Sequence, residues 1–292
     1  MSKDKFPCML ASPNKFMHRI HFPAIAQIKV DGMRANIIHT DGKTIVYSRN
    51  GKIMEMFGRF DKSTPPETVL DGEFIVQIDG QTLDRKSGNG ILHKAVVGTI
   101  SKEETEMIKM IVFDLISYEH WQTGVYDKPY ANRWKDTKIQ AKLHPELYEV
   151  VETFDVNNMS DVTKLYKKVI RKGEEGLVVK NADSSWENKR SKNMIKMKEV
   201  LEMDLKITEW VEGDGKYQGM LGKFMCTNKD GTIIVGVGTG YSDRQRMEYD
   251  KSLVGKICSV QYNEIITSRD KDTKSLFLPV FVEIRDDKDT PD

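Results

Sequence analysis

A short apolar run that ends in a lysine constrains this chain more than any other stretch. Residues 24–28 have the length and composition of a buried strand, and Lys29 follows them directly. A lysine amine is protonated and unreactive at neutral pH, but burial and nearby cations lower such a pKa and expose the lone pair. The stretch predicts a nucleophile at Lys29. A strand end with a solvated lysine and an Asp-Gly turn is the plainer alternative.

The residues after Lys29 suit a turn and a phosphate ligand. Gly32 allows the backbone to bend tightly or to approach a ligand closely, and the planar fork of Arg34 matches a phosphate group. Residues 34–48 are rich in strand-forming side chains on either side of Asp41-Gly42, a dipeptide typical of hairpin turns. We therefore expect a hairpin after the first strand.

Composition bounds the class of protein. The 292 residues provide room for one large or two ordinary domains, and 39% hydrophobic with 30% charged residues fits a soluble globular chain. The net charge of +1 indicates that any nucleic-acid surface is a local patch. Residues 1–31 lack a long apolar run, and Cys8, Cys226 and Cys258 lack metal-like spacing. We expect a cytoplasmic protein with reduced thiols, no signal peptide and no membrane contact.

The pattern Lys29-Val-Asp31-Gly32-Met-Arg34 resembles the KxDGxR signature of the covalent nucleotidyltransferases, which comprise ATP-dependent DNA ligases, RNA ligases and mRNA capping enzymes. These enzymes couple a nucleoside monophosphate to the lysine amine, release pyrophosphate and pass the nucleotide to a nucleic-acid end. The resemblance implies that Ile28 and Arg34 contact the nucleotide and that Asp31 supports the site. It also implies that Arg34 contacts the phosphate at a DNA nick.

A cationic turn follows the hairpin. Ser48-Arg49-Asn-Gly-Lys52 resembles the SRxG element of the same superfamily, which implies that Arg49, with Lys52 beside it, binds the DNA backbone. Arginines directed at phosphates position a nucleic acid without reading its sequence. A solvated pair of cations on a turn is the alternative.

Two carboxylates interrupt the apolar strand expected over residues 68–76. Asp71 and Glu73 are flanked by aliphatic and aromatic residues, and a buried carboxylate is costly without a partner. Asp71-Gly-Glu73 resembles the DGE motif of the superfamily, which implies that Glu73 contacts ribose or a metal ion and that Asp71 supports it. Exposed acids on one face of a half-buried sheet are the alternative.

An aromatic residue in the buried-type run 107–116 is a candidate for base stacking. Val-Phe113-Asp-Leu resembles the element whose aromatic side chain stacks on the nucleobase, and stacking on a purine uses the same physics as aromatic packing. Phe113 as an ordinary core residue is the alternative. We assign no role to Arg133 or to the glycine- and lysine-rich residues 85–98.

Apolar residues at helical spacing predict a helix that begins at Ser160 as N-cap and ends at Gly173. Glu175-Gly-Leu-Val-Val-Lys180 follows and resembles the EGxxxK motif. Hard oxygen ligands such as Glu175 suit Mg²⁺ that is shared with substrate phosphates. A charged strand after a helix is the alternative.

Lys196 and Lys198 alternate on an expected strand and therefore share one face. They resemble the paired KxK motif that closes the catalytic domain, which implies contacts with the α-phosphate. A solvated basic surface is the alternative.

A second domain follows, because short β segments dominate the rest of the chain. Strands are expected at 205–211, 222–228, 232–237, 256–265 and 280–284, with a helix near 243–253. Five strands and one helix suggest an OB-type barrel, a common nucleic-acid platform. We see no long insertion between the first two strands, so a DNA-encircling hairpin is not expected there.

The segment after the last expected strand reads Arg285-Asp-Asp287-Lys288. It resembles the RxDK end of the ligase OB domain. The resemblance implies that Arg285 and Lys288 contact pyrophosphate during lysine adenylylation, with Asp287 in support. In isolation this segment would be a polar tail.

Taken together in order, these elements resemble those of the minimal ATP-dependent DNA ligases, including compact viral and bacteriophage ones, so a virus-encoded enzyme fits. The implied architecture is α+β, with a nucleotidyltransferase domain over residues 1–201 and an OB domain over 202–292. The implied reaction seals nicks in duplex DNA through lysine–AMP, with ATP as adenylate donor and Mg²⁺ (or Mn²⁺) held by Glu73 and Glu175. We expect a monomer that serves DNA repair, replication and recombination.

Three rivals remain open at this stage. A capping guanylyltransferase shares the lysine motif and an OB domain, but would take GTP. An RNA ligase would prefer nicked RNA. An OB-type DNA-binding protein with a decayed transferase domain would form no nucleotide adduct, although the intact Lys29, Glu175 and Lys198 argue against decay.

Overall fold

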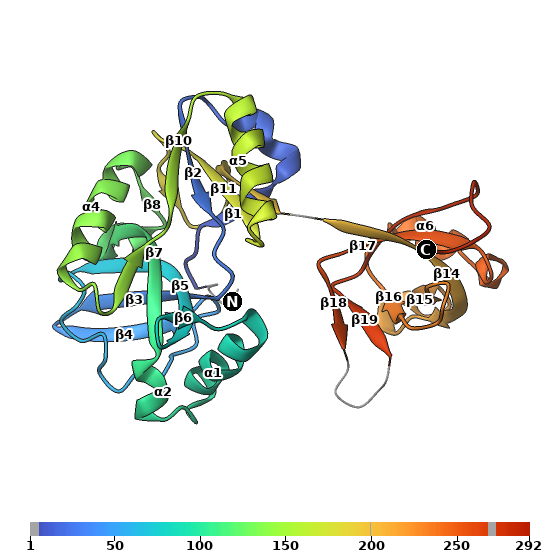
Figure 1. The fold of residues 1–292 in the computed structure, drawn as a ribbon, viewed down its shortest axis with the longest axis horizontal. Helices are drawn as coiled ribbons and strands as arrows, with labels where there is room; N and C mark the ends of the chain where they lie inside the picture. Colours follow the sequence, from blue (N-terminus) through green and yellow to red (C-terminus); the bar gives the residue numbers. More distant parts are fainter. Residues whose placement is uncertain (1–5, 199, 268–272) are drawn as a thin grey trace. The chain divides into compact units, whose positions relative to one another are not determined.

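The computed structural model describes residues 6–198, 200–267 and 273–292, and the chain divides into two compact units, residues 1–198 and 199–292 (Figure 1). This division lies three residues before the predicted boundary at 201/202. Sheets with flanking helices form the first unit and a mainly β structure forms the second, which confirms the predicted α+β class.

Two sheets form the first unit. One sheet has five strands, in the order β1 (Leu10–Pro13), β13 (Arg190–Lys198), β11 (Gly176–Asn181), β2 (Ala24–Ile28) and β10 (Thr153–Val156). The other sheet has the order β4 (Lys43–Ser48), β3 (Met33–Thr40), β5 (Thr68–Ile78), β7 (Ile108–Ser117) and β9 (Tyr148–Val150), with β6 (Gln81–Thr82) paired to β5. A separate pair joins β8 (Val125–Tyr126) to β12 (Trp186–Glu187).

The predicted hairpin is confirmed. Strands β3 and β4 pair in antiparallel register from Ala35–Ser48 to Thr40–Lys43. Asp41 and Gly42 between them have φ values of 51° and 70°, which tight hairpin turns require.

Alternation along each strand divides the core of this unit into layers. On β2, Ala24, Ala26 and Ile28 pack toward helix α5 (Met159–Arg171), whereas Ile25 packs with residues of the other sheet and helix α4 (Tyr130–Leu143). On β3, Ile37 packs toward helix α1 (Arg85–Val97) and Ile38 toward the first sheet. The two sheets therefore share an inner layer of side chains, and each has a helix-covered outer face.

Local signals set the helix ends, although one predicted cap is wrong. Asn158, not Ser160, caps α5, because the Asn158 side chain accepts a hydrogen bond of 3.0 Å from the Asp161 backbone. Gly173 with φ of 80° follows this helix, as the C-terminal signal predicted. The remaining helices of this unit are α2 (Lys102–Glu106), α3 (Tyr118–Thr123) and the 3₁₀ helix η1 (Asn14–Arg19).

Two segments have more structure than their local patterns indicated. Residues 85–98, to which the sequence assigned no role, contain α1, capped by Asp84 and ended by Gly98 at φ of 75°. Residues 1–23 contain three prolines, which disfavour regular structure, but β1 and η1 lie within them. Strand β1 pairs in parallel with β13, a partner nearly 180 residues later, so no local pattern could reveal it.

The second unit is a five-stranded sheet in the order β16 (Ile234–Val237), β15 (Leu221–Thr227), β14 (Leu201–Glu212), β17 (Ile257–Tyr262) and β20 (Val280–Ile284). Its two edges meet, because the Phe281 backbone donates a 2.8 Å hydrogen bond to the Thr239 carbonyl just beyond β16. Gly240 permits this closure: a Cβ there would lie 2.3 Å from the Phe281 carbonyl oxygen. The predicted helix region contains α6 (Asp243–Glu248) and the 3₁₀ helix η3 (Lys251–Leu253).

The strand predicted over 256–265 is too long. It ends at Tyr262, and a separate hairpin follows, formed by β18 (Glu264–Thr267) and β19 (Lys274–Phe277). The connection from β14 to β15 spans residues 213–220 and contains only the 3₁₀ helix η2 (Gly215–Tyr217), as the sequence predicted for that position.

Two cations are buried in the inner layer of the first unit. Arg133 is 1% exposed; its Nε and Nη2 donate to Asp114 at 2.8 and 3.1 Å, and its Nη1 donates to the Ser184 carbonyl at 3.0 Å. Lys180 is 5% exposed, and its Nζ lies 4.0 Å from the centre of the Tyr130 ring. Burial lowers the pKa of Lys180 to about 7, and Arg133 adds to this effect, whereas Asp114 opposes it.

Replacing Arg133 by Met should lower the free energy of unfolding by about 3–5 kcal/mol, because it leaves the buried Asp114 carboxylate without its cation. Urea denaturation measures the loss. Lys189→Met is the matched control: it breaks a surface pair with Glu187 in which the lysine side chain is 64% exposed, and should cost less than about 1 kcal/mol. Equal losses in the two variants would contradict a structural role for Arg133.

Lys180 should make stability depend on pH between about 7 and its ordinary value of 10.5. In that window folded Lys180 is neutral and unfolded Lys180 is protonated, so unfolding takes up a proton and a rise in pH opposes it. The wild type should therefore gain stability relative to Lys180→Met by up to about 1.4 kcal/mol per pH unit. Denaturation at pH 7, 8, 9 and 10 tests this, with Lys167→Met on the exposed side of α5 as a surface control. A constant difference would contradict it.

Candidate active site

Strand alternation places several of the predicted site residues on the inner faces of the two sheets, whereas the side chain of Ile28, a predicted nucleotide contact, packs toward α5. Lys29 follows Gln27 and Ile25 in the inward series of β2, and Lys196 and Lys198 lie opposite the outward-packed Ile195 and Met197 on β13. From the other sheet, Arg34 on β3, Glu73 on β5 and Phe113 on β7 belong to the inward series. The fold thus brings residues from four separated sequence motifs into one layer.

Three adjacent strands set the position of Lys29. The Lys29 backbone donates a 2.9 Å hydrogen bond to the Gly176 carbonyl, and Gly176 is also the ladder partner of Lys198. Gly176 has φ of 144°, and a Cβ on it would lie 2.0 Å from the Met197 carbonyl oxygen. Only glycine fits between the strands at this position. Gly176, the glycine of the EGxxxK motif, therefore allows the close strand spacing that places Lys29 near Lys198.

The Lys29 side chain is half-buried and pairs with a carboxylate. Its Nζ contacts Glu175 Oε2, and the two side chains are 26% and 24% exposed. A reactive amine needs this combination, since it must be held in place and still be reached by a substrate.

Gly32 allows β5 to approach the Lys29 loop. A Cβ on Gly32 would lie 2.2 Å from the Phe74 carbonyl oxygen and 3.0 Å from Cγ of Glu73. Asp31 lies beside this contact and pairs with Arg85 of α1, with 3.3 Å between Oδ1 and Nε. The glycine- and lysine-rich helix therefore contributes to the site, which sequence reasoning missed.

Arg34 is committed to a structural pair. Its Nε and Nη2 donate to the two oxygens of Asp71 at 3.0 and 2.6 Å, and Nη1 donates to the Met9 carbonyl at 2.8 Å. Burial alone lowers the pKa of Arg34, but the Asp71 carboxylate outweighs this and raises it. Asp71 is 3% exposed, so this ion pair offsets the cost of its charge.

Glu73 lies next to these charges. Burial raises the pKa of Glu73 to about 7, although Arg34 and Lys29 lower it, and the carboxylates of Asp71 and Glu175 raise it further. A carboxylate in such surroundings gains stability from a bound cation.

Phe113 has cations beside its ring. Nζ of Lys180 lies 5.2 Å from the ring centre and Cζ of Arg34 lies 5.4 Å away. The Tyr130 hydroxyl donates a 2.9 Å hydrogen bond to the Phe113 carbonyl, which fixes the backbone. The ring is only partly buried, so stacking on a planar ligand remains open to it.

Lys196 and Lys198 are partly buried and surrounded by like charge. Burial lowers the pKa of Lys196, and Lys198 and Arg190 lower it further. Burial also lowers the pKa of Lys198, against the opposing charge of Glu175. Cations in this state are stabilised by an anionic ligand.

The cationic turn after the hairpin lies at the surface. Ser48 binds Lys52 through a 2.8 Å backbone hydrogen bond, and the Arg49 backbone donates to the Arg34 carbonyl at 3.2 Å. The Arg49 and Lys52 side chains are exposed. This turn is thus joined by its backbone to the strand that carries Arg34.

In the second unit, the RxDK segment forms ion pairs. Arg285 binds both oxygens of Asp287 through Nε and Nη2, at 2.8 and 2.7 Å. Arg285 Nη1 also donates to Asp204 Oδ2 at 2.9 Å, and Lys288 Nζ contacts the same oxygen. The sequence pattern did not indicate Asp204, because it lies about 80 residues earlier on β14.

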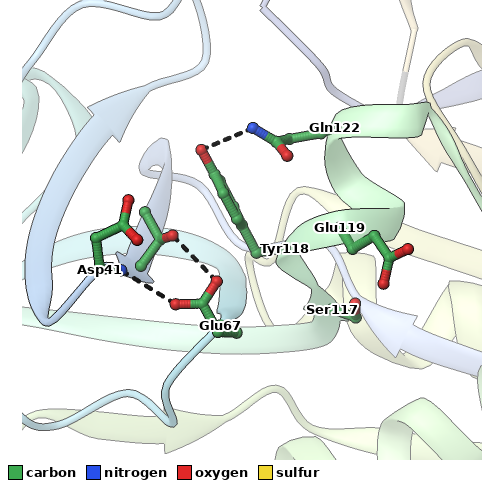
Figure 2. A pocket seen from close by; sticks show the side chains of 7 residues that line it. Asp41, Glu67, Ser117, Tyr118, Glu119 and Gln122 are labelled. Atoms are coloured by element: carbon green, nitrogen blue, oxygen red, sulfur yellow. Dashed lines mark hydrogen bonds between the residues drawn. The ribbon is translucent and has the colours of Figure 1, made fainter.

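A pocket elsewhere on the first unit is not this site. Figure 2 shows it at the turn after β3 and around α3, where Glu67 accepts hydrogen bonds from Thr40 Oγ1 and the Asp41 backbone at 3.1 and 3.0 Å. Arg34 lies six residues from Thr40 along β3, roughly 20 Å at strand spacing. The carboxylates of Asp41, Glu67 and Glu119 in the lining of this pocket also do not suit a triphosphate.

Two classes of feature are not observed in the described part of the chain. Residues 6–198, 200–267 and 273–292 contain no group of three or more His, Cys, Asp or Glu side chains arranged to hold a metal ion. Among the helices of these residues, none combines the length and the apolar character needed to cross a lipid bilayer.

Comparison with known proteins identifies both units. The ATP-dependent DNA ligase domain family matches residues 8–198, and the DNA ligase OB-like domain family matches residues 212–285. The DNA ligase of Enterobacteria phage T4 is 29% identical, across 97% of this chain and 69% of the phage protein. The DNA ligase of Haemophilus influenzae is 24% identical, across 82% of this chain and 80% of the bacterial one.

Solved structures agree. The structure "Pmar-Lig_PreS3" superposes with a TM-score of 0.83 at 26% identity, across 96% of this chain and 68% of the other. The ATP-dependent DNA ligase of bacteriophage T7 in complex with ATP shares the fold, with a TM-score of 0.55 at 20% identity over 98% of this chain and all of that one (100%). The ligase-domain match spans well over half of the sequence, and this chain belongs to the family of ATP-dependent DNA ligases.

Proposed function

We propose that this ligase joins a 3′-hydroxyl to a 5′-phosphate at nicks in duplex DNA, and that Lys29 carries the AMP. A lysine–AMP intermediate is typical of the family. The observation that supports Lys29 is its placement, half-buried, in contact with Glu175 and in the same layer as Glu73, Lys196 and Lys198.

In the first step, Nζ of Lys29 attacks the α-phosphorus of ATP. A nitrogen–phosphorus bond forms, the bond from the α-phosphorus to pyrophosphate breaks, and the amine loses a proton. Glu175, already in contact with Nζ, is the nearest carboxylate to accept it. An oxygen of the 5′-phosphate at the nick then attacks the α-phosphorus; the nitrogen–phosphorus bond breaks and the amine takes a proton back. The 3′-hydroxyl oxygen loses its proton, attacks the activated 5′-phosphorus and displaces AMP. Positioning and charge neutralisation carry these phosphoryl transfers.

The nucleotide contacts follow from the inner layer. Phe113 stacks on adenine, and Lys196 and Lys198 bind the α-phosphate. The Ile28 side chain packs toward α5, so Ile28 contacts the nucleotide through its backbone, next to Lys29. Arg34 has five N–H groups, and three nitrogens already serve Asp71 and Met9, so it keeps donors for ribose or the nick phosphate. Asp31 and Asp71 act through the arginines that they bind.

Glu73 and Glu175 fit a Mg²⁺ ion shared with substrate phosphates. Such sites use one or two carboxylates, so the lack of a larger cluster among the described residues is compatible with one. The fit rests on the donor set: Glu73 lies in the inward series of β5, and Glu175, beside Lys29, is 24% exposed, so both offer the hard carboxylate oxygens that Mg²⁺ prefers. When bound, the metal (Mg²⁺, or Mn²⁺ in its place) neutralises charge that develops on phosphate.

Residues outside the nucleotide layer bind the other ligands. Arg49 and Lys52 bind the DNA backbone, where charge and exposure matter more than base identity. Arg285 and Lys288 bind the pyrophosphate of ATP in the first step, and Asp287 orients Arg285. The enzyme acts as a monomer in DNA repair, replication and recombination.

The ligase-domain family match favours DNA sealing over the two enzyme rivals, capping with GTP and RNA ligation. Labelling with α-labelled ATP or GTP, followed by a chase with nicked DNA or nicked RNA, separates these reactions. Label from ATP alone that chases into sealed DNA supports the proposal. Label from GTP, or transfer to RNA alone, would overturn it.

Lys29→Ala should abolish the covalent protein–AMP adduct and the sealing of ordinary nicks, because no other amine replaces Nζ. It should still seal nicks whose 5′-phosphate already carries AMP, since that step does not use the lysine as nucleophile. Denaturing gels with α-labelled ATP measure the adduct. Lys192→Ala, an exposed lysine on β13, is the control. A labelled adduct in the Lys29 variant would remove this residue from the role.

Phe113→Ala should raise the apparent KM for ATP in adduct formation by roughly tenfold, because stacking on a base contributes about 1–3 kcal/mol. Phe113→Tyr retains the aromatic face and should stay near the wild type. Initial rates over a series of ATP concentrations give both values. An unchanged KM in the alanine variant would indicate that the ring serves only to pack the core.

A further inference from the structure

Asp204 on β14 holds the two cations of the RxDK segment through one oxygen. Its Oδ2 accepts from Arg285 Nη1 at 2.9 Å and contacts Lys288 Nζ. Asp204 is 4% exposed, whereas the Arg285 and Lys288 side chains are 22% and 37% exposed. A nearly buried carboxylate with two cationic partners is satisfied, and its partners keep access to solvent.

The backbone around Asp204 is as constrained as its side chain. Strand β14 lies in the middle of the five-stranded sheet, and Asp204 faces Ser259 in the ladder with β17. The Asp204 backbone donates to Asp292 Oδ2 at 2.8 Å and accepts from the Asp292 backbone at 2.9 Å. The segment after β20 is therefore tied to β14 through the RxDK motif and again at Asp292, four residues beyond Lys288.

Both cations keep donors for another ligand. An arginine has five N–H groups and a lysine ammonium has three. Each of the three Arg285 nitrogens makes one hydrogen bond, Nη1 to Asp204 and Nε and Nη2 to Asp287. Lys288 Nζ contacts Asp204 and Asp292. Because a single oxygen binds both, the two cationic nitrogens lie close enough together to contact one phosphate group.

We propose that Asp204 is a positioning residue for lysine adenylylation: it holds Arg285 and Lys288 side by side so that they can bind the pyrophosphate of ATP. This inference rests on the proposed role of those two cations. Long cationic side chains lose rotamer freedom when they bind a phosphate, and a carboxylate that already holds them reduces that loss.

The role is specific to one step. Pyrophosphate is present only while Lys29 is being adenylylated, and sealing of a nick that already carries AMP does not involve it. A residue that only stabilised the OB unit would affect both steps in the same proportion. The ratio of the two rates, measured on one preparation, is independent of the fraction of folded enzyme.

The test uses Asp204→Asn in the full chain, first freed of AMP with pyrophosphate and Mg²⁺. One assay measures protein–AMP formation from α-labelled ATP below saturation, and the other measures sealing of pre-adenylylated nicked DNA without ATP. Asp230→Asn is the matched control, because Asp230 lies in an exposed turn of the same unit and caps Thr232, which an asparagine can still do.

Asp204→Asn should slow adduct formation roughly ten- to a hundredfold and change sealing of pre-adenylylated nicks less than about twofold. Asp230→Asn should change neither. Unchanged adduct formation in Asp204→Asn, or equal losses in both assays, would overturn the inference.

Arg285→Ala and Lys288→Ala separate this inference from the function on which it rests. If neither alanine variant slows adduct formation, the proposed pyrophosphate contact is wrong. If they slow it but Asp204→Asn does not, only the positioning role fails. In the double variant Arg285→Ala/Lys288→Ala, adding Asp204→Asn should have no further effect on adduct formation, because Asp204 acts through those residues.

Discussion

Charged side chains that point into the layer between two sheets must find partners there, and this requirement organises the first unit. Asp71 is balanced by Arg34, Asp114 by Arg133, and Glu175 by Lys29. Each pair joins residues that are far apart in the sequence, so the pairs also tie separate segments of the chain together. A buried pair contributes little net stability beyond an apolar one, but a broken pair is costly, and this makes the arrangement of the layer specific.

The same pairs differ in exposure, and this difference distinguishes pairs that can only support the fold from a pair that a ligand can reach. The Arg133 and Asp114 side chains are 1% and 7% exposed and are closed to any ligand. Lys29 and Glu175 are each about one quarter exposed and can exchange their contact for a substrate. Arg34 lies between these cases, with its fork on Asp71 and two donors left. This change from buried pairs to an accessible one is what the proposed role of Lys29 requires: rigid support around a side chain that a ligand can reach.

Sequence reasoning recovered what local pattern encodes. Alternation placed Lys196 and Lys198 on one face, and Asp41-Gly42 predicted the hairpin. It failed where a long-range partner decides the outcome: β1 needs β13, and Asp204 matters only through residues about 80 positions later. It also failed where two similar local signals compete, as at Asn158 and Ser160, because only the folded geometry shows which side chain reaches the free backbone N–H. The order of the sequence motifs, by contrast, was enough to predict the family, and it did not depend on long-range pairing or on helix caps.

The electrostatics of the inner layer also indicate the kind of ligand that it fits. Lys196 and Lys198 crowd like charge in a partly buried place, and their lowered pKa values record that cost. Glu73 carries the opposite cost, as a carboxylate in low dielectric. A phosphate would relieve the first cost and a cation the second, and this is the physical reason for proposing a metal–nucleotide complex as the ligand. The proposed ligand would therefore bring charges opposite to those that are costly in this layer.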